Sequence, residues 1–157
     1  MSSAGIDISH SRLRRLYEYW EVKRDGREMP SRNDIDPVDI SYVLGDVMLV
    51  DVIGEEPFRF RIRLHGTNLA ERSGSDITGE MLDQLPENER GLVGQRCTEV
   101  ATKGQPLHCR SNSELDGRLF RYECIILPLS ADGKKVNMEL VAVIHDEPKR
   151  NSTILHG

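Results

Sequence analysis

Residues 58–65 read FRFRIRLH, and apolar and basic side chains alternate through the stretch without interruption. A period of two places one set of side chains on each face of a β-strand, so this segment predicts a strand with one buried face. The preceding segment, residues 47–53, is apolar and β-branched, and Gly54 follows it at a turn position. The two segments together predict an antiparallel hairpin.

Upstream of the hairpin, four apolar residues have the spacing of one helical face: Leu13, Leu16, Tyr17 and Trp20. Ser9 or Ser11 is in position to cap this helix, and Gly26 is expected to end it. A second, short helix is predicted over residues 37–44, where Asp36 supplies the cap and a proline occupies the first turn.

Downstream of the hairpin, the sequence predicts a short helix over residues 67–72 and a longer one over residues 86–102. Three strands follow, at residues 107–115, 119–129 and 136–144, and Asp116-Gly117 gives a hairpin turn between the first two. The weak pattern of residues 107–115 indicates an edge strand. This order predicts an α+β protein: a five-stranded antiparallel sheet with helices on one face, and the N-terminal helix on the other face or in a dimer interface.

Composition limits the class of protein. We expect a flexible N-terminus over residues 1–9, one domain over residues 10–146 and a flexible tail over residues 147–157. The net charge of -5 argues against a general nucleic-acid binder. No apolar run approaches the length of a membrane span and no secretory signal is evident, so we expect a cytoplasmic protein. The cysteines are three, an odd number, and we expect neither disulfides nor a metal site.

Several short segments, in this order and spacing, resemble the short, stand-alone PAS proteins of alphaproteobacteria. The matching residues are Leu16, Tyr19-Trp20, Arg24, residues 29–32, 34–37, Asp39-Ile40, Asp51-Val52, residues 63–67, 76–79 and 127–129. The resemblance covers residues 10–146 and implies the PAS fold, a small-molecule cavity between sheet and helices, and frequent dimers. It does not name a ligand, because PAS domains bind haem, flavin, small acids or nothing.

Neither haem nor flavin is favoured as a cofactor. Photoreactive PAS proteins carry a cysteine on the short helix after the second strand, and residues 67–79 contain none. The usual haem ligand is a histidine on the long helix, and residues 86–102 contain none. His65 and His108 lie at strand ends, where a lone histidine is more often an ordinary surface residue.

The candidate ligand-binding residues are Arg63, His65, Thr67, Asp76 and Thr78. By strand parity, Arg61, Arg63 and His65 project from one sheet face and form a row suited to a carboxylate or phosphate. The structural alternative is that this row pairs with acids such as Glu18 or Glu123. Asp76 and Thr78 either line the cavity or serve turn chemistry in the Asp-Ile-Thr-Gly segment.

The aromatic stripe of the first helix has two readings. Leu13, Leu16, Tyr17 and Trp20 form an interface with a second copy of the chain, or they pack on the chain's own sheet.

The expected function is a sensory or adaptor module that binds a small molecule or a protein partner and signals in trans, as a homodimer. No catalytic motif is present, so an enzyme is not expected. Two alternatives remain: a small acid–base enzyme, which a buried Asp or Glu with a perturbed pKa would support, and a structural dimerisation module with a filled core.

Overall fold

The computed structural model describes residues 6–85, 87–115 and 118–146, with backbone alone for residues 87–93, 113–115 and 118–120. The expected turn at Asp116-Gly117, the tail and the first five residues lie outside this range. The elements are α1 (Ser11–Arg24), η1 (Arg32–Asp34), η2 (Pro37–Ile40), η3 (Leu44–Asp46), β1 (Val47–Ile53), β2 (Arg59–His65), α2 (Thr67–Ser73), η4 (Leu82–Gln84), α3 (Glu87–Lys103), β3 (Leu107–Leu115), β4 (Arg118–Leu129) and β5 (Met138–Asp146). Among these helices, none is long and apolar enough to cross a membrane.

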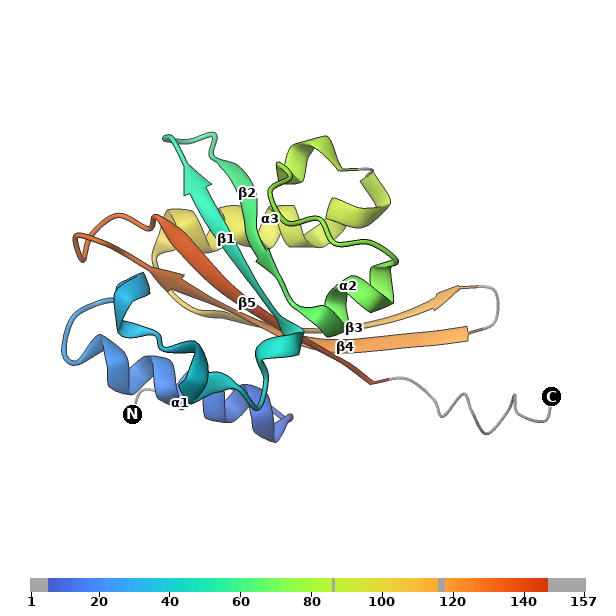
Figure 1. Ribbon diagram of the computed structural model, residues 1–157, viewed down its shortest axis with the longest axis horizontal. Coiled ribbons are helices and arrows are strands. Elements are labelled where there is room, and N and C mark those ends of the chain that lie inside the picture. The colour runs from blue at the N-terminus through green and yellow to red at the C-terminus, as the bar shows by residue number, and fades with distance from the viewer. Residues whose placement is uncertain (1–5, 86, 116–117, 147–157) are drawn as a thin grey trace.

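The five strands form one sheet in the order β2-β1-β5-β4-β3, and every neighbouring pair is antiparallel. The predicted hairpin is β1–β2, and the predicted three-strand meander is β3–β4–β5, so the expected α+β architecture is confirmed (Figure 1). β3 lies at one edge, as its weak pattern indicated. β5 pairs with β1 as well as with β4, which makes the last strand of the chain the centre of the sheet.

Helices cover the two faces of the sheet separately (Figure 1). On one side, called the α1 face, Leu49, Leu127 and Leu140 pack with the apolar stripe of α1. On the other side, called the α3 face, Val50, Ile126 and Val141 pack with residues of α2, η4 and α3. Successive residues of each strand therefore contribute to different cores, because the side chains alternate between faces.

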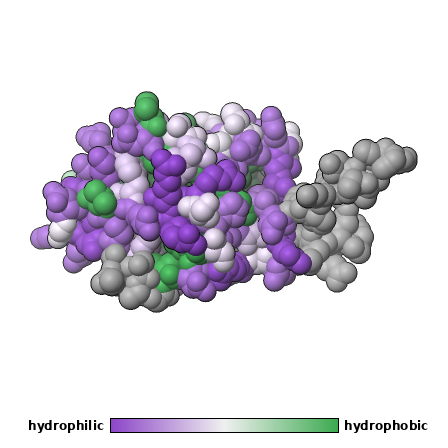
Figure 2. All heavy atoms as spheres, turned by 90° about the horizontal axis from the view of Figure 1, so that it is seen from below, coloured by the Kyte–Doolittle hydropathy of each residue, from purple (hydrophilic) through white to green (hydrophobic). Residues whose placement is uncertain are grey.

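The apolar stripe of α1 lies in the chain's own core. Leu13 and Leu16 are fully buried, and Tyr17 and Trp20 are 3% and 2% exposed. These four residues are not available as interface anchors for a second copy, which corrects the first of the two readings. The side of the molecule that carries α1 presents a mainly hydrophilic surface with small, separate hydrophobic patches (Figure 2).

A proline lies in β4 without disrupting the sheet. Pro128 is opposite Glu139 of β5, whereas pairing with β3 ends at Ile126. The N–H that proline lacks has no strand to meet on that side, so the residue is tolerated. Its carbonyl instead accepts a hydrogen bond of 2.9 Å from Nε1 of Trp20, which fixes α1 on the sheet.

The start of α1 is capped by a residue of the sheet. Neither Ser9 nor Ser11 caps the helix through its side chain, contrary to expectation; the N-cap residue is His10. The Glu123 carboxylate on β4 accepts hydrogen bonds from the backbone N–H groups of Ser9 (2.8 Å) and His10 (2.9 Å), and lies 2.6 Å from Nε2 of His108. Ile8 is buried, so the flexible N-terminus expected over residues 1–9 does not extend to residue 8.

We expect Glu123→Gln to lower the free energy of unfolding by about 2 kcal/mol at pH 7, because charge-assisted hydrogen bonds are lost in a buried site. Burial alone raises the pKa of Glu123, but the hydrogen bonds from His108, Ser9 and His10 outweigh it and lower that pKa. The stabilisation is therefore complete above the unfolded pKa of 4.5 and disappears as pH falls through the lower, folded pKa.

Urea unfolding at pH 7 and at pH 3 measures this effect. The difference between wild type and Glu123→Gln should shrink at the lower pH. Glu99→Gln, on the exposed side of α3, is the matched control and should change stability by less than about 0.5 kcal/mol. An equal loss for Glu123→Gln at both pH values would contradict the role given to this carboxylate.

Candidate functional site

A β-bulge in β2 changes which predicted residues face the interior. Leu49 is opposite Leu64 but Val50 is opposite Ile62, so Arg63 is the extra residue. The bulge reverses the parity of the residues beyond it. Leu64 is consequently 40% exposed, whereas the side chain of His65 is only 6% exposed. The expectation that Arg61, Arg63 and His65 share a face is therefore wrong for His65.

The two arginines share one acid on the α1 face. Nε of Arg61 and Nε of Arg63 each lie 3.2 Å from a carboxylate oxygen of Asp51, which is buried. The structural alternative for this row holds, with Asp51 in place of Glu18 or Glu123. Arg63 therefore lies on the opposite side of the sheet from α2 and α3.

Three of the predicted ligand residues lie together beside α2. Nδ1 of His65 is 3.8 Å from Asp76 and 3.5 Å from the backbone nitrogen of Ile77. Asp76 accepts hydrogen bonds from both the amide and the hydroxyl of Thr78, at 3.0 and 2.6 Å, in a local turn. Burial lowers the pKa of His65, and the charge of Asp76 opposes that shift. Thr67 is exposed at the first residue of α2. This cluster closes a turn, and its polar atoms are used within the chain.

The residues that carry the PAS resemblance have structural roles. Met29 is buried, the carbonyl of Pro30 accepts from the N–H of Ser130, and Asp34 closes a capping box with Ser31. Gly66 passes so close to other backbone that a Cβ atom would lie 2.7 Å from the carbonyl oxygen of Val47. These residues stabilise the contacts between segments of the fold. They do not themselves indicate which ligand the domain binds.

One acid on the α3 face has no such role. Glu139 is fully buried in the central strand, opposite Val50 of β1 and Pro128 of β4. Neither of its carboxyl oxygens makes a hydrogen bond of standard geometry within the described part of the chain, and the Cys97 thiol is its polar neighbour there. Burial raises its pKa to about 8, and the nearby Cys97 thiol offsets this only in part, so the group is a neutral acid at pH 7.

Sequence reasoning missed Glu139, although a signal was present. It interrupts an apolar run in the predicted strand 136–144. An acid in that position is ordinary in an edge strand and costly in a central one, because both neighbours and both faces are then covered. Only the strand order shows that β5 is central.

The three cysteines lie on the same face. Cys97 of α3 and Cys124 of β4 are buried, and Cys109 of β3 is half-buried. Cys109 and Cys124 are directly opposite each other in the β3–β4 register. Nε of Arg96 is buried beside them without a hydrogen-bond partner in the described residues.

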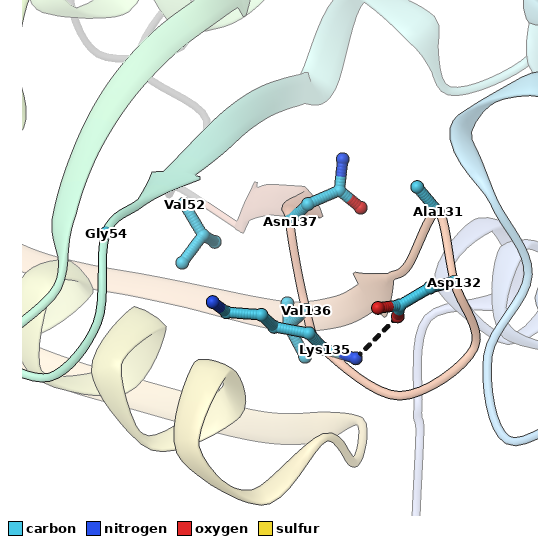
Figure 3. A pocket seen from close by; sticks show the side chains of 7 residues that line it. All are labelled: Val52, Gly54, Ala131, Asp132, Lys135, Val136 and Asn137. Carbon is cyan, nitrogen blue, oxygen red and sulfur yellow. Dashed lines mark hydrogen bonds between the residues drawn. The ribbon is translucent and has the colours of Figure 1, made fainter.

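A hollow of about 270 Å³ lies at another end of the sheet, between β1 and the turn before β5 (Figure 3). Asp132 and Lys135 contribute its polar groups. The Asp132 carboxylate already accepts from the N–H groups of Lys134 and Lys135 and from the hydroxyl of Ser130. The Lys135 ammonium pairs with Glu55. The two charged groups of this hollow are therefore already engaged, Asn137 adds an amide, and Glu139 does not line it.

Chemically, the α3 face offers an apolar setting with one neutral carboxylic acid. A protonated carboxyl can donate one hydrogen bond and accept others. It suits a ligand group that both accepts and donates, such as a carboxylic acid or an amide. Across the described residues, no group of three or more His, Cys, Asp and Glu side chains is arranged to hold a metal ion.

The sheet order and the helical crossover between β2 and β3 define the chain as an α+β domain. The PAS-domain family model matches residues 8–141, and the chain belongs to the PAS-domain family. PAS domains are generally sensory modules.

The comparison with solved structures gives matches of low sequence identity. The PAS domain of Bordetella pertussis BvgS has a TM-score of 0.45 and 13% identity, covering 77% of this chain and 92% of that one. The Rhodobacter sphaeroides LOV protein has a TM-score of 0.46 and 10% identity, covering 92% and 72%. A domain of an HTR-like protein from Haloarcula marismortui has a TM-score of 0.39 and 17% identity, covering 64% and 97%. No curated protein matches the chain.

Proposed function

We propose that this PAS domain senses a small molecule bound at the α3 face, where Glu139 supplies the polar contact, and that it signals in trans. The observation that carries the proposal is a fully buried carboxyl group that makes no hydrogen bond of standard geometry in the described residues and has a weak partner, the Cys97 thiol, beside it. Such a group destabilises a fold unless something else uses it. A ligand with a carboxylic acid or amide group would satisfy both carboxyl oxygens.

The position of Glu139 suggests how the signal leaves. The next residue, Leu140, belongs to the α1 face, so a movement of β5 would change side-chain packing in both cores. A ligand that favours one position of β5 would change the packing of α1, provided that its affinity differs between the two states. The receiver of the signal is then a protein that contacts α1, or a second copy of the chain.

Native mass spectrometry of gently purified protein tests the proposal. We expect wild type to carry a small bound molecule that Glu139→Leu, which has no polar group, has lost, while Glu99→Gln on the outside of α3 retains it. The same spectrum reports the homodimer that we expect. Wild-type protein with no bound mass, and with a melting temperature unchanged by any small carboxylic acid or amide, would contradict this function.

A second function, a small acid–base enzyme, is favoured by the same residue. A buried glutamate with a pKa of about 8 is suited to general acid–base work. Catalysis additionally requires turnover, so the two functions separate experimentally: a sensor releases the bound molecule unchanged on denaturation, and an enzyme converts it. Chemical identity of the released molecule before and after incubation distinguishes them.

A further inference from the structure

Three cysteines that are far apart in the sequence meet on the α3 face. Cys109 and Cys124 oppose each other on β3 and β4, and both side chains join the α3-side core. Cys97 lies on α3 and is close enough to Cys124 to raise the pKa of the Cys124 thiol. The cluster therefore contains one half-buried thiol at the sheet edge and two buried thiols behind it.

The register brings Cys109 and Cys124 to a distance that a disulfide can span. Facing residues of antiparallel strands have Cα atoms about 4.5 or about 5.5 Å apart, depending on the type of pair. Disulfides join Cα atoms about 4.4–6.8 Å apart, so either type of pair is within range. The two side chains point to the same face, and their thiols already form a hydrogen bond. A bond between them requires no change of register.

Their surroundings make Cys109 the reactive member. The hydrogen bond from Cys124 lowers the pKa of Cys109 to about 7, burial opposes this, and the charge of Arg96 assists it. The thiolate is the nucleophilic form of cysteine, and half exposure on an edge strand gives a small oxidant access. Cys124 is fully covered, and its pKa is raised well above the usual value by Cys109 and by burial. It is therefore suited to resolve an oxidised Cys109 rather than to react first.

We propose that Cys109 and Cys124 form a dithiol that hydrogen peroxide oxidises to a cross-strand disulfide. In the first step the Cys109 thiolate attacks one peroxide oxygen, the O–O bond breaks, and Cys109 sulfenic acid and one water form after protonation. In the second step the Cys124 sulfur attacks the Cys109 sulfur, the S–O bond breaks, and a second water leaves. Two thiols and one hydrogen peroxide thus give one disulfide and two waters.

This modification site is independent of the ligand proposed for Glu139. The disulfide would tie the edge strand β3 to β4 under the C-terminal half of α3, where Cys97 and Val100 pack. Oxidation would therefore stiffen one wall of the α3 face whether or not a ligand binds there.

The test treats the full chain with hydrogen peroxide and measures intact mass and non-reduced peptides. We expect a loss of two hydrogens, a Cys109–Cys124 cross-linked peptide, and reversal by dithiothreitol. Cys97→Ser is the matched control and should still form the disulfide. Cys124→Ser should instead accumulate Cys109 sulfenic acid that dimedone traps, and Cys109→Ser should lose both products.

The wild-type peptide map shows whether the Cys109–Cys124 disulfide forms, even where a variant folds poorly. A Cys97–Cys124 cross-link, or higher oxidation of Cys109 with no cross-link, would overturn the proposal. Wild-type protein that carries no bound molecule but still forms the disulfide would contradict the sensing function and leave this dithiol intact, so the two failures are distinguishable.

Discussion

Replacing Gly66 with alanine is expected to lower the free energy of unfolding by about 3 kcal/mol, which is at the upper end for an over-packed site. A Cβ atom would lie 2.7 Å from the carbonyl oxygen of Val47 and closer still to the carbonyl oxygen of Gly45. Both atoms belong to backbone, so no side-chain rotation relieves the clash. The N–H of Gly66 also donates to Val47 at 2.8 Å, and this bond would be strained.

Gly94→Ala provides the matched control, since its Cβ atom would meet only Leu82 at 3.6 Å, an ordinary contact. Gly94 lies within α3, where alanine is favoured over glycine by about 1 kcal/mol. Urea unfolding at pH 7 should therefore show opposite signs for the two substitutions. Equal stability of Gly66→Ala and wild type would contradict the close backbone contact between Gly66 and residues 45–47.

The second large effect is a dependence of stability on pH that Glu139 causes. Its folded pKa of about 8 is above the unfolded value of 4.5. Between these values the unfolded chain has lost the proton and the folded chain retains it, so stability falls as pH rises. The expected slope is about 1.4 kcal/mol per pH unit, which amounts to a few kcal/mol by pH 8.

Glu139→Gln removes the titrating group and keeps nearly the same shape. Stability of ligand-free wild type and of Glu139→Gln should be similar at pH 4.5, and the variant should become progressively more stable than wild type up to pH 8. Chemical unfolding at half-unit pH intervals measures both curves. Parallel curves across this range would contradict a buried, neutral Glu139.

The hairpin and the meander followed from the sequence because alternation and turn residues are local signals. The strict alternation of residues 58–65 predicted β2, and the apolar spacing of Leu13, Leu16, Tyr17 and Trp20 predicted the buried stripe of α1. Each of these patterns can be recognised within a short stretch of sequence. The sequence did not predict the sheet order, in which β5 joins the meander to the hairpin by pairing with β1.

The site depended on contacts that the sequence does not display. The bulge at Arg63 moves the side chain of His65 to the other face of the sheet, and no residue in the segment predicts the bulge. Glu123 caps a helix more than a hundred positions away, and Asp51 pairs with arginines across the hairpin. Such pairings depend on register, which is set by the whole sheet.

The residues that maintain the fold and the residues of the proposed sites are different. Gly66, Met29 and Asp34, which carry the PAS resemblance, hold the scaffold together through close backbone contact, burial and capping. Glu139 and the cysteines Cys97 and Cys124 occupy the interior of the α3 face, and none of them is among the residues that resemble the family. The residues of the proposed ligand and redox chemistry are therefore different from those that maintain the fold.

The protonation state of Glu139 is the most direct test of the claim that the α3 face holds a free, neutral acid. Carbon-13 NMR of ligand-free protein labelled at the glutamate carboxyl carbons follows each group through a pH titration, and Glu139→Gln assigns the signal. We expect one carboxyl to titrate near pH 8 and to be absent from the variant. If every glutamate titrates below about pH 5, Glu139 is charged and partnered at neutral pH, and the proposed sensing site does not exist.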